Sequence, residues 1–173
     1  MPLPIALLLH PAARIALSEF TVHWSTVIGS VGLGALYFWR ARHPPAGVAE
    51  HSPTTGQRTM FIVALATILL SLNGWLHDLS DYYLFSAHMV QHLVLTLFVP
   101  PLLIMGTPGW MLRPALRWPG VGPAARWATA APMAFVIFNV VLAVWHLPPM
   151  YEYAMEHHNV HIVQHLCFMI SAT

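Results

Sequence analysis

Long apolar runs separated by short polar joints dominate this chain of 173 residues. The runs approach the roughly 20 residues that a helix needs to cross a bilayer, and in lipid they must be helical because every backbone group needs an internal partner. We therefore predict an all-α, polytopic transmembrane helical bundle of about five spans. The predicted spans are Thr21–Trp39, Thr59–Leu76, Leu84–Gly106 and Trp127–His146, with a fifth that begins near His157.

The two ends of the chain differ from the predicted spans. Residues 1–20 contain only the short apolar run Ile5–Leu9, so we expect an external lead-in segment there and a transmembrane domain over residues 21–173. The fifth run is still apolar from Val160 to Thr173 and has no Arg, Trp or Tyr to anchor its far end. We expect the natural chain to continue beyond residue 173.

The charged residues predict the orientation in the membrane. Six of the seven arginines lie in the first and third joints, namely Arg40, Arg42 and Arg58, and then Arg113, Arg117 and Arg126. Arg14, near the N-terminus, is the exception. The second and fourth joints carry only acidic residues, namely Asp78 and Asp81, and then Glu152 and Glu156. Because positive joints stay in the cytoplasm, the N-terminus is predicted to lie outside.

Composition agrees with a bilayer environment. The chain is 57% hydrophobic and 8% charged, whereas soluble domains carry about 25% charged residues. The net charge of +1 gives no reason to expect nucleic acid as a partner.

Histidines gather on one side of this predicted membrane region. Ten of the twelve fall outside, and only His43 and His51 fall on the cytoplasmic side. The outer ten are His10, His23, His77, His88, His92, His146, His157, His158, His161 and His165. Two predicted spans also share a phrase, His-Met-Val-Gln-His-Leu from His88 and His-Ile-Val-Gln-His-Leu from His161. An ionisable side chain within a membrane usually serves a function, and neutral imidazole is a common metal ligand.

Helical spacing predicts which of these histidines act together. Residues four apart share a helix face, so His88 and His92 point one way, as do His161 and His165. The second member of each pair lies about 6 Å deeper than the first. These four are the predicted metal ligands. His77 and His146 are predicted to complete the site from the second and fourth spans.

Some histidines have a simpler explanation. A histidine at a helix end can lie in the membrane interface with its polar tip in water. We assign this role to five of them: His10, His23, His43, His51 and His157.

Three metal chemistries fit the pattern. Copper is the first, because imidazole suits Cu(II) and thioether suits Cu(I). Met150 and Met155 are secondary candidates to receive Cu(I), and Met169 extends the His161/His165 stripe, although filling gaps in packing would also explain each methionine. The second is haem b between two axial histidines. The third is a His-box di-iron membrane oxygenase, which the external placement of the boxes disfavours. A structural scaffold with no cofactor is a further alternative.

Two segments resemble a known family. The run LFSAHMVQHLVLTLFVPPLLIMGTPGW from Leu84 resembles the signature helix of the multi-spanning CtaG family of cytochrome c oxidase assembly factors. The stretch WHLPPMYEYAMEHHNVHIVQHLCF from Trp145 is similar to a later segment of that family, and Leu36–Leu79 shows weaker similarity. The family-matching histidines are His88, His92, His146 and His165.

The resemblance implies a function. It implies a multi-pass protein of the cell inner (plasma) membrane that is needed to make an active haem–copper oxidase and takes part in copper supply. It also implies a protein that is not an enzyme, with subunits of cytochrome c oxidase or of another respiratory complex as partners. Members of the family have further spans, so ligands from later helices would lie outside this sequence.

Overall fold

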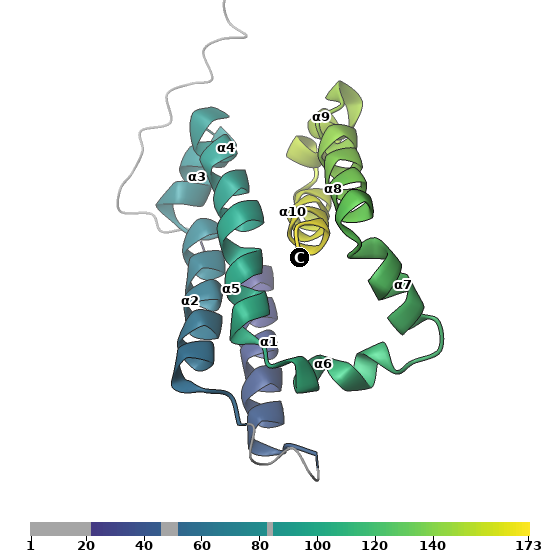
Figure 1. Ribbon diagram of the computed structural model, residues 1–173. Coiled ribbons are helices and arrows are strands. Elements are labelled where there is room, and N and C mark those ends of the chain that lie inside the picture. Colours follow the sequence, from purple (N-terminus) through teal and green to yellow (C-terminus); the bar gives the residue numbers. More distant parts are fainter. Residues whose placement is uncertain (1–21, 46–51, 83–84) are drawn as a thin grey trace, which may run out of the picture.

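The computed structural model describes residues 22–45, 52–82 and 85–173, and these residues form an all-helical structure (Figure 1). The all-α prediction is confirmed for this part of the chain. The predicted lead-in at residues 1–20, including His10, lies outside the described residues, as does His51.

The first two helices are α1 (Trp24–Arg42) and α2 (Thr55–Ser71). Arg40 and Arg42 lie in the last turn of α1, where positive charge interacts favourably with the helix dipole. At the start of α2, the Thr54 hydroxyl accepts from the Gln57 amide while the Gln57 side chain accepts from the Thr54 amide. This capping box fixes where α2 begins.

A short helix and a long, distorted helix follow. They consist of α3 (Trp75–Tyr82), α4 (Phe85–Leu93), the π-helical turn η3 (Val94–Phe98) and α5 (Val99–Gly106). Ser86–Gly106 is one continuous helix of 21 residues. Pro100 and Pro101 lie within this helix, at the start of α5. The distortion is a π-helical turn just before them, which fits a proline that lacks an N–H and crowds the carbonyl of the preceding turn.

The second half of the chain contains α6 (Gly109–Leu116), α7 (Val121–Ala128), α8 (Ala131–Trp145), α9 (Pro148–Glu156) and α10 (His158–Ser171). The axes of α7 and α8 differ in direction by 83°. The predicted span Trp127–His146 is therefore straight only from Ala131. Pro132 lies in the first turn of α8, where its missing N–H costs nothing, so it does not bend the interior of a helix.

Length and hydropathy identify few complete membrane spans in the described residues. Ser86–Gly106 can cross a bilayer by these criteria, and α7 with α8 forms a second candidate if the bent pair counts as one span. Helix α2 is apolar but shorter, with 17 residues. The five-span topology stays a prediction.

The same arrangement of helices occurs twice along the chain. An apolar helix, a short helix and a helix with the repeated histidine phrase follow one another as α2–α3–α4 and again as α8–α9–α10. Trp75 precedes His88 by the same number of residues as Pro148 precedes His161. Figure 1 shows α3 and α9 at one end of the molecule, with α6, the end of α1 and the start of α2 at the other. The repeat therefore brings both histidine phrases to the same end.

Helices α2 and α5 pack with their backbones close together. A Cβ added to Gly106 would lie 2.6 Å from the backbone nitrogen of Phe61 and 2.9 Å from its Cα. The Tyr37 hydroxyl donates to the Gly106 carbonyl at 3.0 Å, and its ring stacks on Phe61 with centroids 3.8 Å apart. Only glycine fits between these groups.

Gly106→Ala should therefore lower the free energy of unfolding by about 2 kcal/mol, because backbone atoms of α2 cannot move aside as a flexible side chain can. Gly32→Ala is the matched control, since no described atom lies within 4 Å of its added Cβ. Thermal unfolding in detergent compares the two variants. Equal unfolding temperatures would show that the contact between α2 and α5 is looser than described.

Candidate metal site

The two histidine phrases face each other across α4 and α10. The ring centroids of His88 and His161 lie 5.9 Å apart, and those of His92 and His165 lie 5.1 Å apart. Because each first member pairs with a first member and each second with a second, the two helices run in the same direction. The structure therefore brings together the four residues predicted as metal ligands.

Within each helix the paired rings are also close. The Nε2 atoms of His88 and His92 are 2.7 Å apart, a hydrogen bond in which one nitrogen must carry the proton and the other accept it. The rings of His161 and His165 stack with centroids 4.5 Å apart. A metal ion bound by either Nε2 atom of the first pair would have to break this hydrogen bond, and on the donating ring the proton would have to move to Nδ1 to free the lone pair.

All four rings are buried, and two of them, His92 and His165, have ring nitrogens without a hydrogen-bond partner among the described residues. His165 is 4% exposed, and within the described part of the chain neither of its ring nitrogens has a hydrogen-bond partner. The same is true of Nδ1 of His92. A buried polar atom without a partner costs about 1–3 kcal/mol. Such nitrogens are available to accept a bond from, or to coordinate, a bound ligand.

His77 lies beside this site, and its hydrogen bonds determine which of its ring nitrogens carries the proton. It comes from α3 and not from the end of α2, where the sequence placed it. The fully buried Gln91 amide donates to the Ser71 carbonyl at 2.6 Å and to Nδ1 of His77 at 3.1 Å, while its Oε1 accepts from Ser80 at 2.9 Å. Because the Ser71 carbonyl can only accept, the Gln91 atom that faces it must be the amide nitrogen. The same nitrogen donates to Nδ1 of His77, so neutral His77 carries its proton on Nε2. His77 is better suited to donate a hydrogen bond than to bind a metal.

His23 belongs to the same group of rings, although the sequence interpretation placed it in the membrane interface. Its ring lies edge-on to His77, with centroids 4.2 Å apart. Its backbone amide donates to Oδ1 of Asn73 at 2.7 Å, which ties the start of α1 to the connection between α2 and α3. No periodic signal in the sequence marks His23, because it precedes its helix.

His146 lies at the edge of the site. Its exposed ring follows α8, and its Nδ1 donates to the Leu142 carbonyl at 2.7 Å, which leaves Nε2 with a lone pair for a ligand. Its centroid is 6.1 Å from that of His92, and the buried Phe168 ring contacts both. The exposed rings of His43 and His157 also bond a carbonyl of their own helix, consistent with their interfacial assignment.

As placed, the described residues contain no group of three or more His, Cys, Asp or Glu side chains arranged to hold a metal ion. The imidazoles are neighbours, but their nitrogens do not converge on one point. Binding would require the His88–His92 hydrogen bond to open and the rings to rotate. The arrangement therefore provides donors of one type, neutral imidazole nitrogens, close enough to be recruited by small side-chain movements.

Comparison with known proteins identifies a family. The family model for the cytochrome c oxidase caa3 assembly factor (Caa3_CtaG) matches residues 35–173. No curated protein and no solved structure matches the chain.

Proposed function

The chain belongs to the cytochrome c oxidase caa3 assembly factor family, and from this premise we propose that it supplies copper to the oxidase during assembly. Copper would be held at the outer face of the membrane by His88, His92, His161 and His165. His146 would contribute Nε2 from the edge of the site. The role is that of a carrier and not of an enzyme, and its partners would be oxidase subunits.

One observation supports this proposal above the others. The ring of His165 is buried, has no hydrogen-bond partner among the described residues, and lies beside the rings of His92 and His161. An apolar side chain would fill that position at lower cost if packing were its only role. A metal ion would give the unpaired nitrogens a partner, and imidazole binds copper strongly.

The proposed membrane topology supports delivery on the outer side. Arg40, Arg58 and Arg113 lie on α1, α2 and α6 at the end of the molecule opposite to α3 and α9 (Figure 1). Under the positive-inside rule, the arginine end is cytoplasmic and the histidine end external. We propose a multi-pass protein with five spans in this sequence and its N-terminus outside.

The test is the metal content of the protein purified from copper-supplemented cells. Copper by elemental analysis without a Soret absorption band is the expected result. A Soret band would support the alternative, a haem b-binding subunit of a respiratory complex. Iron without haem would support a di-iron oxygenase, and absence of any metal would support a scaffold.

His92→Ala should reduce copper affinity about tenfold, because it removes one donor and also breaks the hydrogen bond to His88. The amount of protein in the membrane should not change. His43→Ala is the matched control, since this histidine is exposed and its nearest bonded partner is a carbonyl of α1. Equal copper binding by both variants would count against His92 as a ligand.

A further inference from the structure

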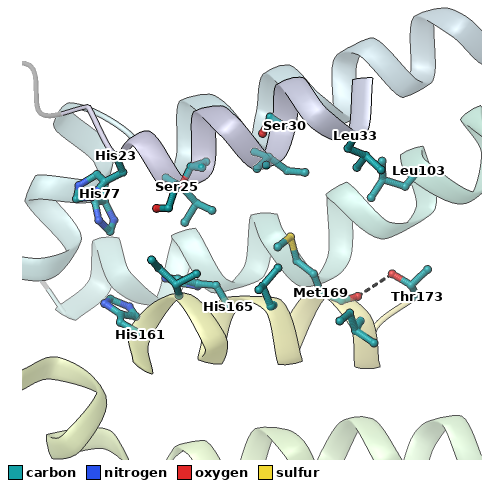
Figure 2. A pocket seen from close by; sticks show the side chains of 17 residues that line it. His23, Ser25, Ser30, Leu33, His77, Leu103, His161, His165, Met169 and Thr173 are labelled. Atoms are coloured by element: carbon teal, nitrogen blue, oxygen red, sulfur yellow. Dashed lines mark hydrogen bonds between the residues drawn. The ribbon is translucent and has the colours of Figure 1, made fainter. Parts of the chain in front are cut away.

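A cavity of about 370 Å³ lies between α1, α2, α5 and α10, directly beside the histidines. Figure 2 shows His23, His77 and His161 at one end of it, with Leu33, Leu103 and Thr173 toward the other. The histidine site is therefore open on one side to an apolar chamber.

One face of α10 lines this cavity with three donors. His161, His165 and Met169 are spaced four residues apart, and all three contribute to the cavity wall. Side chains on a helix lean toward its N-terminus, so the Met169 side chain leans toward His165. Figure 2 shows its sulfur directed into the cavity. A soft thioether thus lines the same cavity wall as the His165 imidazole.

The charges of the side chains around the cavity indicate which ions it can hold. Among the described residues no Asp or Glu side chain lines the cavity, and all candidate donors are neutral. The cost of burying an ion rises with the square of its charge, and here no carboxylate would offset it. A dication such as Cu(II) or Zn²⁺ is therefore disfavoured relative to a monocation.

Resting on the proposed function, we infer that the copper is carried as Cu(I), bound by His161, His165 and the thioether of Met169. Thioether ligands select Cu(I), and this ion accepts the low coordination number that three donors on one helix face can provide. His88 and His92 on α4 would supply further imidazole nitrogens to the same ion, as the proposed function requires.

Met169 also has a packing role, which the test must separate from metal binding. It lies against the core residues Ile68, Leu72, Leu95 and Val99. Met169→Leu keeps an apolar side chain of similar volume and removes the sulfur, so it should preserve this packing. Met105→Leu is the matched control, because Met105 is 56% exposed and does not line the cavity.

The experiment is an anaerobic titration of the purified protein with Cu(I) against a competing chromophoric chelator, combined with X-ray absorption at the copper edge. Met169→Leu should weaken Cu(I) binding about tenfold and remove sulfur scattering, whereas Met105→Leu should change neither. Zn²⁺ and Cu(II) should bind the wild-type protein more weakly than Cu(I).

Two results would overturn the inference and leave copper carriage intact. One is copper bound with nitrogen scattering alone, and the other is a preference for Cu(II) or Zn²⁺. Absence of copper binding in the wild-type protein would overturn both the inference and the proposed function.

Discussion

Gln91→Leu should lower the free energy of unfolding by about 3 kcal/mol, because it leaves buried hydrogen-bonding groups without their partner. The Gln91 side chain is fully buried and joins the Ser71 carbonyl, Nδ1 of His77 and the Ser80 hydroxyl. These groups lie on α2 and α3, so the amide holds three helices together. Thermal unfolding in detergent measures the loss.

The same substitution at Gln164 is the control, and the repeat in the chain makes it an exact structural counterpart. Gln164 occupies the position of Gln91 in the second histidine phrase and is only 1% exposed. Within the described residues its Nε2 atom has no hydrogen-bond partner. Gln164→Leu should therefore cost less than about 1 kcal/mol, since no bonded group is abandoned. Equal losses at the two positions would show that the bonds of Gln91 contribute nothing beyond packing.

Hydropathy predicted the helices that are apolar along their length and missed those that are not. The predicted runs coincide largely with α2, with α4 to α5, with α8 and with α10. The segments that became α3 and α9 were interpreted as polar joints, because each is short and amphipathic and carries acidic residues. Equal spacing of Trp75 from His88 and of Pro148 from His161 was a usable signal for both helices.

The sequence identified the neighbouring histidines and missed the residues that support them. Helical spacing and the repeated phrase were sufficient to predict that His88, His92, His161 and His165 lie together. The phrase also contains Gln91, but its partners come from α2 and α3, and their placement depends on tertiary packing that periodicity does not encode. His23 was missed for the same reason, since its contact with His77 joins segments distant in sequence.

His165→Ala should abolish the contribution of this protein to oxidase assembly. The substitution removes the donor whose ring lies beside those of both His92 and His161, so copper affinity should fall by about 100-fold. In cells whose only copy carries the substitution, cytochrome c oxidase activity in isolated membranes should fall to the level of a deletion. Immunoblotting should show an unchanged amount of the assembly factor.

Excess copper in the medium distinguishes a carrier from a scaffold. A site weakened in affinity can still fill when the free ion concentration rises, so added copper should restore part of the oxidase activity to His165→Ala cells. The deletion strain reports any restoration that bypasses the protein, and His43→Ala cells should retain full activity without added copper. A scaffold role would be indicated if the His165→Ala protein is present in the membrane but inactive, and if added copper raises oxidase activity no more than it does in the deletion strain. Full activity of His165→Ala without added copper would remove this residue from the site.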